Sequence, residues 1–425
     1  MTEFPLIQKT FPGGLRVVLL PREQVQTVTF MVMIGVGSRY EKPRQNGLSH
    51  FLEHMFFKGT ERRPDKKAIA VEMDALGAEF NAFTSEEITS YYVKVAKENI
   101  GKGADVVADI LLRSLFPAEE IERERGVIIE EIRMYTDDPA RHVWHLWTQA
   151  MYGTHPLGRR VDGTEKTVSA FKRADFLSYV KAHYHTENAV VAVAGNFEIK
   201  EMQRMLEQLF RDLPVGKETF PTLAPSRKPA SRANFERRAT IDQTHVVVGV
   251  PGLSLLDEDR PAAEVLATLL GGGMSSRLFL RVREDHGLAY SVRTFNESYT
   301  DAGFVATQAG LRSARAAFAV QLILEEYDRL MEELVPEAEL MKAKQMIRGH
   351  MMIGLEETNA LALFAGTQTL LEKRVQTPMD IWHKIEAVTA EDVRQVAKRL
   401  LAPKKRALAL LGPQKSAKEF EKLLA

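Results

Sequence analysis

The feature that most constrains the fold of this chain is an internal duplication. Asp175 and Gly195 in the first half recur as Asp392 and Gly412 in the second half, each pair separated by the same 217 residues. At 425 residues the chain is too long for one compact core. Two copies of one unit, each of about 200 residues, are therefore the simplest expectation.

Within each copy, helix patterns and strand patterns are mixed without strict βαβ alternation. Apolar, β-branched stretches at 15–20 and 28–34 predict strands, and amphipathic stretches at 101–114 and 119–136 predict helices. This mixture predicts an α+β fold with two homologous halves. Each half is expected to be a mostly antiparallel sheet with helices packed on it, and the two halves to form a clamshell.

The same pattern suggests where the halves meet along the chain. We expect an N-terminal domain at residues 1–213 and a homologous C-terminal domain at 238–425. Residues 214–237 are rich in Pro, Lys, Arg and Ser and show little periodicity, which predicts a linker.

Composition excludes several kinds of site and partner. The chain has no cysteine, so disulfides, thiolate ligands and cysteine nucleophiles are excluded. Its 57 basic and 57 acidic residues give a formal net charge of zero, so we expect no nucleic-acid or membrane partner. The longest apolar stretch, 27–36, is too short to span a bilayer. Because the start has no signal or transit pattern, we expect a cytoplasmic protein.

Residues 48–55 carry a candidate metal site. His50 and His54 are four positions apart, so their imidazoles leave the same face of a helix and can bind one Zn²⁺. Glu53 projects beside them and can take a proton from water activated by the metal. The order His-x-x-Glu-His is the inverted-zincin signature. The alternative is that these are ordinary core or surface residues whose spacing arose by chance.

The predicted helix at 119–136 offers a third ligand. Glu124 and Glu131 lie seven positions apart on a stripe that is otherwise apolar, and buried carboxylates need a partner such as a metal. Helix geometry favours Glu131 as the ligand. Glu124 would then contact a ligand and not the metal itself. Glu130 lies about 120° round the helix from Glu124 and remains an alternative ligand. Most isolated helical glutamates are simply solvated.

Two further residues near the motif have alternative readings. Phe57, one turn past the motif, is either a core residue or part of a substrate pocket. Asn81 interrupts a strand pattern, where asparagine is disfavoured. It is either a turn or bulge residue, or a side chain presented to a ligand at a sheet edge.

These residues together resemble the pitrilysin/insulysin family of inverted-zincin metallopeptidases, in particular the bacterial relatives of the β-subunit of the mitochondrial processing peptidase. The resemblance covers nearly the whole chain. It rests on the sequences at 47–60, 76–84, 121–132, 275–278 and 283–290.

The resemblance implies a zinc endopeptidase that hydrolyses unfolded peptides or small polypeptides. It implies one Zn²⁺ per chain, bound by His50, His54 and a glutamate that the family pattern matches to Glu131. Glu53 would be the general base for a zinc-activated water. The competing interpretation is a non-catalytic peptide-binding or scaffold subunit that needs a different partner chain for activity.

The resemblance also implies how substrate is held. Asn81 and Ala82 fall on the edge strand with which similar enzymes pair the substrate backbone. Arg283 and Tyr290 match an Arg/Tyr pair that contacts substrate near the scissile bond and stabilises the oxyanion. In dimeric relatives this pair and the zinc motif are split between subunits. We therefore expect a homodimer with composite active sites, with a heterodimer as the alternative.

Overall fold

The computed structural model describes residues 5–217 and 229–424. It contains two compact units, each built from three stretches of the chain. Unit 1 comprises Met1–Ile132, Arg160–Pro221 and Ile353–Thr377, and unit 2 comprises Arg133–Arg159, Thr222–Met352 and Pro378–Ala425. Within the described residues, no helix has both the length and the apolar character needed to cross a membrane.

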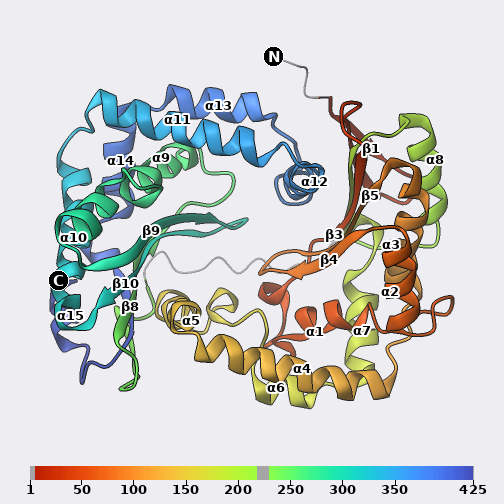
Figure 1. The fold of residues 1–425 in the computed structure, drawn as a ribbon, viewed down its shortest axis with the longest axis horizontal. Coiled ribbons are helices and arrows are strands. Elements are labelled where there is room, and N and C mark those ends of the chain that lie inside the picture. The colour runs from red at the N-terminus through yellow and green to blue at the C-terminus, as the bar shows by residue number, and fades with distance from the viewer. Residues whose placement is uncertain (1–4, 218–228, 425) are drawn as a thin grey trace. The chain divides into compact units, whose positions relative to one another are not determined.

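Unit 1 is organised on a six-stranded sheet with strand order β1-β2-β6-β3-β5-β4 (Figure 1). All neighbouring strands are antiparallel except β2 and β6. The strands are β1 (Ile7–Thr10), β2 (Arg16–Pro21), β3 (Thr27–Ile34), β4 (Glu79–Thr84), β5 (Thr89–Ala96) and β6 (Ala189–Gly195). The helices are α1 (Leu48–Met55), α2 (Lys66–Ala75), α3 (Ile100–Arg113), α4 (Ala118–Asp137, whose last residues belong to unit 2), α6 (Glu165–Ala170), α7 (Arg173–His183), α8 (Ile199–Leu209) and α12 (Thr358–Thr367).

Unit 2 repeats this plan on a five-stranded sheet with strand order β7-β11-β8-β10-β9. Its strands are β7 (Ala233–Arg237), β8 (Gln243–Pro251), β9 (Ala289–Ser298), β10 (Gly303–Arg312) and β11 (Ala407–Gly412). Its helices are α5 (Pro139–Tyr152), α9 (Arg260–Gly271), α10 (Ala316–Glu332), α11 (Glu337–Gly354, whose last two residues belong to unit 1), α13 (Pro378–Ala387), α14 (Ala390–Leu400) and α15 (Lys418–Leu423).

The predicted α+β class with two similar, mostly antiparallel halves is confirmed. The division at 1–213, 214–237 and 238–425 stays a prediction. Part of the predicted linker, 218–228, lies outside the described residues, while its last five residues form β7. Composition gave no sign of that strand.

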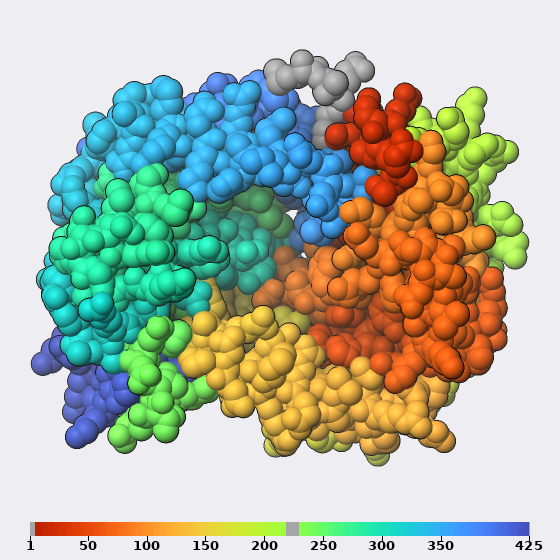
Figure 2. Space-filling view, viewed as in Figure 1, coloured from red at the N-terminus to blue at the C-terminus, as the bar shows by residue number. Residues whose placement is uncertain are grey.

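The main core of unit 1 lies on one face of its sheet. Alternate strand residues such as Phe30 and Val32 point to this face and pack with the apolar sides of α1 and α3. In the space-filling view, residues 5–100, coloured red to orange, lie together in one continuous body (Figure 2).

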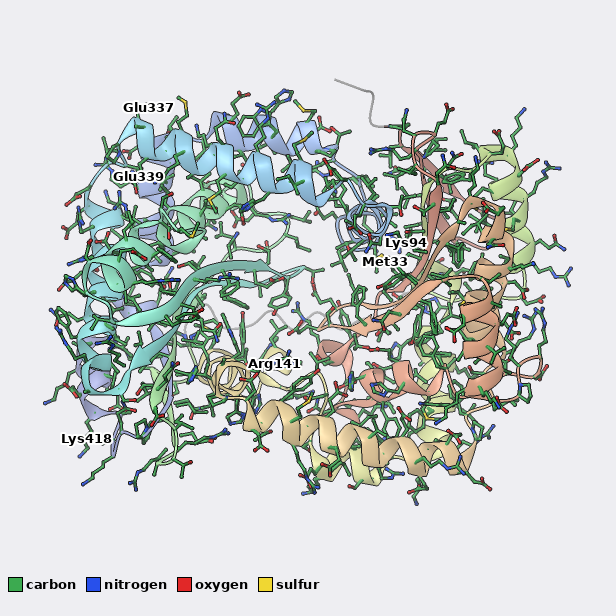
Figure 3. The ribbon with its side chains drawn as sticks, viewed as in Figure 1. Met33, Lys94, Arg141, Glu337, Glu339 and Lys418 are labelled. Carbon is green, nitrogen blue, oxygen red and sulfur yellow. The ribbon has the colours of Figure 1, made fainter. Side chains whose placement is uncertain are left out.

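The other face of this sheet is covered by a helix from the far end of the chain. Met31 and Met33 point to this face, where they pack with Leu361 and Ala365 of α12. Lys94 Nζ lies 3.6 Å from Glu357 Oε2 just before the helix, and Met33 and Lys94 are seen beside α12 in Figure 3. Unit 2 mirrors this arrangement, because α5 from the first half packs on its sheet. Each unit therefore needs a helix supplied by the other half of the sequence.

Small residues let α12 lie close to the strands. A Cβ placed on Gly366 would come within 2.4 Å of Met33 Sδ. The buried positions of α12 are spaced three and four apart, as expected for a helix with one face on a sheet: Thr358, Leu361, Ala362, Ala365 and Gly366.

We predict that Leu361→Ala lowers the free energy of unfolding of unit 1 by about 2–4 kcal/mol, because it leaves a cavity against the sheet. Leu361 is 1% exposed, whereas Leu363 on the same helix is 38% exposed. Leu363→Ala is thus the matched control and should cost less than about 1 kcal/mol. Scanning calorimetry of the two variants measures the difference. Equal losses would contradict the view that α12 is an integral layer of unit 1.

Candidate metal centre

Helix α1 has one apolar face and one polar face. Leu48, Phe51, Leu52 and Met55 are 0% exposed and anchor the helix in the core of unit 1. The opposite face carries the two histidines and the glutamate of the motif, all of them partly buried. The helix predicted at 48–55 is therefore present, and its polar face is held in a fixed direction by its apolar one.

Three potential ligands converge from α1 and α4. His50 Nε2 lies 3.7 Å and His54 Nε2 lies 3.8 Å from Glu131 Oε2. One ligand atom from each residue lies within 4.8 Å of the others, and this is the one such group of three or more found among the described residues. Tetrahedral zinc with bonds of 2.0–2.2 Å requires ligand atoms about 3.4 Å apart. The three side chains therefore fit a zinc ion with little adjustment.

The protonation of the histidines also suits metal binding. Burial, followed by the neighbouring His54, lowers the pKa of His50, although Glu131 opposes the shift. A lowered pKa keeps the imidazole neutral, which is the form that binds a metal. Glu130, the alternative ligand, is exposed and does not belong to the group of three.

Glu124 orients His54 from behind. Its Oε1 lies 2.8 Å from His54 Nδ1, and its Oε2 lies 2.6 Å from Lys58 Nζ. Burial raises the pKa of Glu124, but the hydrogen bonds from His54 and Lys58 outweigh it and hold the pKa below its ordinary value. An ionised carboxylate only accepts, so His54 Nδ1 carries the proton and Nε2 keeps its lone pair for a metal.

Glu53 lies next to the three potential ligands, and one of its carboxylate oxygens accepts a hydrogen bond. Thr84 Oγ1, at the end of β4, donates to Glu53 Oε2 over 2.7 Å. Burial raises the pKa of Glu53 and the charge of Glu131 adds to the rise, while Thr84 and His54 lower it. A carboxyl with a raised pKa is a stronger base, as proton transfer near neutral pH requires.

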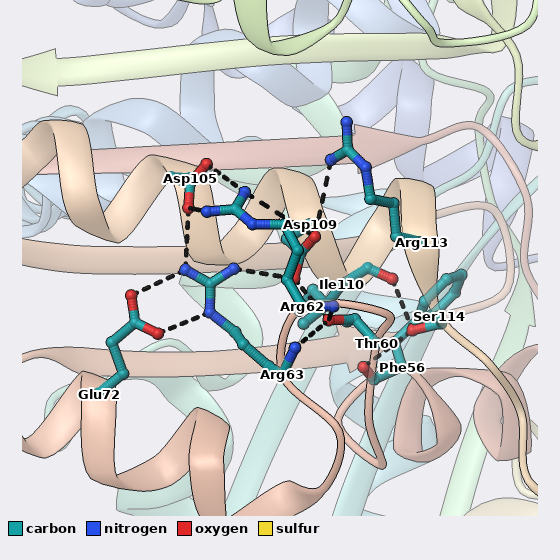
Figure 4. Close-up of polar contacts among 10 residues, drawn as sticks. All are labelled: Phe56, Thr60, Arg62, Arg63, Glu72, Asp105, Asp109, Ile110, Arg113 and Ser114. Atoms are coloured by element: carbon teal, nitrogen blue, oxygen red, sulfur yellow. Dashed lines mark hydrogen bonds and ion pairs between the residues drawn. The ribbon is translucent and has the colours of Figure 1, made fainter.

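The segment after α1 is fixed by a buried ionic network (Figure 4). Asp109 on α3 is fully buried and accepts from Thr60 Oγ1 over 2.6 Å and from Arg63 Nη1 over 2.8 Å. Arg63 also makes a paired contact with Glu72 on α2, with both distances 2.7 Å. This network ties the loop that bears Lys58 to α2 and α3.

The predicted substrate residues lie on an exposed edge. Asn81 and Ala82 are on β4, the last strand of the sheet, with Asn81 exposed and Ala82 buried. The amide N–H of Ala82 donates to Asn81 Oδ1 over 2.9 Å. Phe57 is partly buried, with its ring 6.1 Å from that of Phe80 and 6.4 Å from that of Tyr91. These contacts favour the core reading of Phe57.

Comparisons with known proteins decide the family. Residues 16–165 match the description "Insulinase (Peptidase family M16)" and residues 170–347 match "Peptidase M16 inactive domain". The chain is 38% identical over 412 residues to a protein of Streptomyces coelicolor named an uncharacterized zinc protease, with 96% of this chain and 89% of that protein covered. The chain belongs to the M16 (insulinase) family of peptidases.

Other relatives agree with this assignment. A Bacillus subtilis protein named an uncharacterized zinc protease is 36% identical over 410 residues, covering 95% of this chain and 97% of that protein. A crystal structure of a protease from Helicobacter pylori superposes with a TM-score of 0.89 at 23% identity, covering 96% of this chain and 99% of that chain. The expected resemblance to the pitrilysin/insulysin family and the expected fold are confirmed, and the relatives' names support a zinc protease as the general class.

Arg283 and Tyr290 belong to unit 2, where they contact each other. The Arg283 guanidinium carbon lies 5.4 Å from the centre of the Tyr290 ring and 4.6 Å from that of the Phe279 ring. Arg283 sits in a π-helix, Phe279–Asp285, a rare form that is frequent at functional sites. Tyr290 is 79% exposed. Their contribution to an M16 active site stays a prediction.

The second copy does not carry the ligands of the first. Positions 217 residues after His50 and His54 are Ala267 and Gly271 on α9, and the position 217 after Glu131 is Arg348 on α11. The Arg348 guanidinium carbon lies 4.9 Å from the centre of the Trp382 ring. Neither alanine, glycine nor arginine supplies a metal ligand, in keeping with the "inactive domain" description of the region at 170–347.

Three residues near the candidate metal centre were not predicted from the sequence. Lys58 and Thr84 stand inside conspicuous sequence blocks, but nothing in their spacing showed that they reach Glu124 and Glu53. Strand alternation from Ala82 would have placed Thr84 on the same face of β4. The third, Glu41, makes contacts with the backbone that no side-chain pattern records.

We predict that Glu131→Gln lowers zinc affinity by at least about 100-fold, whereas Glu130→Gln leaves it within twofold. The two glutamates are neighbours on α4, so the pair is a matched test of which one is the ligand. A neutral amide is a poor zinc ligand, because zinc sites use carboxylate, imidazole and thiolate groups. Competition with a chromophoric chelator measures both affinities. Loss of zinc from the Glu130 variant alone would contradict the assignment.

Proposed function

We propose that this chain is a zinc-dependent endopeptidase that cleaves unfolded peptides or small polypeptides, with one zinc ion per chain. The observation that carries the proposal is the convergence of His50, His54 and Glu131, with Glu53 on the same face of α1 as the histidines. Relatives that cover almost the whole chain are named zinc proteases. A cytoplasmic location is part of the proposal and rests on the sequence alone.

The residues divide the chemistry between them. A zinc ion held by the three ligands would polarise the peptide carbonyl and acidify water. Thr84 holds Glu53 Oε2, so Glu53 Oε1 is available to accept the proton of the attacking water. The water oxygen bonds to the carbonyl carbon and the C–N bond breaks. Glu53 then returns the proton to the leaving amine, giving a carboxylic acid and a free amine.

The exposed edge of the sheet favours an extended substrate. Strand β4 is the last strand of the sheet, and its residue Thr84 donates a hydrogen bond to Glu53. An edge strand of this kind can pair with a further extended chain. Such pairing requires several consecutive substrate residues without secondary structure of their own. This supports unfolded peptides, rather than folded proteins, as substrates.

We predict that Glu53→Gln lowers kcat by at least about 10²–10⁴-fold while zinc affinity stays within about threefold, because the variant loses the base and keeps the ligands. Peptide-library digestion, with and without a chelator, measures cleavage, and elemental analysis measures zinc. Retained turnover would refute the role of Glu53. A wild-type protein that holds no zinc and cuts no peptide would instead support the non-catalytic scaffold.

We also propose a homodimer in which Arg283 and Tyr290 of one protomer complete the zinc site of the other. Mixed dimers test this. In such a dimer, one chain carries Glu53→Gln and the other carries Arg283→Ala with Tyr290→Phe. If the sites are shared, all three changes fall in one site, and the other site keeps the wild-type residue at all three positions. We expect about half of wild-type activity, against almost none when all three changes are in both chains. A mixed dimer no more active than the triple mutant contradicts sharing, and a need for a different chain identifies a heterodimer.

A further inference from the structure

The N-terminus of α1 is held by a carboxylate from outside the helix. Glu41 lies six residues before Gly47, the N-cap of α1, and is 3% exposed. Its Oε1 accepts from the backbone N–H of Ser49 over 2.7 Å, and its Oε2 accepts from the N–H of Gly47 over 2.8 Å. Asn46 Nδ2 also donates to Oε2 over 3.2 Å. Both oxygens are therefore committed to the start of the helix that bears the two histidines.

This contact replaces a missing cap. The first N–H groups of a helix have no partner within it, and a Ser, Thr, Asp or Asn side chain at the N-cap usually accepts from them. Here the N-cap is Gly47, which has no side chain and a φ of +94°. A Cβ at this position would lie 2.8 Å from the carbonyl oxygen of Asp162. The close approach requires glycine, so the cap has to come from elsewhere, and a negative charge also suits the helix dipole.

Further bonds continue this anchor into unit 1. Ser49 Oγ lies 2.8 Å from the hydroxyl of Tyr179 on α7, and Asn46 Nδ2 donates to the carbonyl of Arg160 over 2.8 Å. Glu41, Ser49 and Asn46 together fix how far α1 is rotated about its axis. His50 follows Ser49 directly.

Rotation of α1 matters more at the ligands than at the core. Side-chain atoms lie about 5–6 Å from a helix axis, so a rotation of 10° moves an imidazole nitrogen by about 1 Å. Functional groups have to be held to about 0.5 Å. The apolar face of α1 sets the general direction of the helix, but a rotation of this size would still spoil the ligand set with Glu131 on α4.

We propose that Glu41 is a positioning residue of the metal centre, whose carboxylate sets the rotation of α1 and thereby the placement of His50 and His54 opposite Glu131. The proposal rests on the zinc site proposed above. It assigns Glu41 a role beyond stabilising the fold, because the contact acts on the helix that carries two of the three ligands.

A matched control separates positioning from stability. Glu87 is also a buried carboxylate of unit 1, 4% exposed, and pairs with Arg39 over 2.7 Å. The variants Glu41→Gln and Glu87→Gln each keep one acceptor oxygen and lose one charge. Burial raises the pKa of Glu41 to about 7, although the N–H groups of Ser49 and Gly47 oppose the shift. Measurements at pH 8.5 therefore compare the variants with an ionised wild-type carboxylate.

The test is zinc affinity by chelator competition at a temperature where both variants are folded, together with the melting temperature of the metal-free proteins. We expect Glu41→Gln to weaken zinc binding at least tenfold and to change the visible spectrum of the Co²⁺-substituted protein. Glu87→Gln should lower the melting temperature by a similar amount but leave zinc affinity within twofold. Equal zinc affinity in wild type and Glu41→Gln would overturn the proposal.

Two further outcomes are informative. If Glu41→Gln does not fold, Glu41→Asp keeps the charge but withdraws the carboxylate by one methylene group, and it should still weaken zinc binding at least threefold. An unchanged affinity in that variant also overturns the proposal. Failure of the wild-type protein itself to bind zinc contradicts the proposed function, which is distinguishable from a failure confined to the role of Glu41.

Discussion

The candidate site depends on the contact between α1 and α4 through Glu124. This buried carboxylate accepts from His54 and pairs with Lys58, both of which lie on α1 or just after it. A buried charge is stable only when it is paired, so α4 is fixed against α1 at this point. Glu131, two turns further along α4, is thereby brought opposite both histidines. The placement of Glu131 opposite the histidines thus depends on the pairing of the buried Glu124 carboxylate with His54 and Lys58.

The rest of unit 1 restrains this pair of helices. The apolar face of α1 fixes its direction, Glu41 holds its first turn, and the Asp109 network fixes the loop behind it. On the other face of the sheet, α12 from the second half covers strands that would otherwise expose methionine and valine side chains. The candidate metal centre of the first half therefore belongs to a unit whose sheet is covered on one face by a helix from the second half of the chain.

The sequence was informative where polar side chains recur at the spacing of a helix. A spacing of four placed both histidines on one face of α1, and a spacing of seven placed Glu124 and Glu131 on one face of α4. It was uninformative where contacts link distant segments. Periodicity identified apolar helix faces, yet it could not tell that α12 packs on the first sheet and α5 on the second. Glu41 was missed because its partners are backbone N–H groups, which every residue except proline carries.

The central claim is that His50, His54 and Glu131 share one zinc ion. The most direct measurement is anomalous X-ray scattering at the zinc absorption edge from crystals of the wild-type protein. We predict a single peak per chain, at about 2.0–2.2 Å from a nitrogen of each histidine and from a Glu131 carboxylate oxygen. No peak in zinc-supplemented crystals, or a peak away from these three side chains, would contradict the claim.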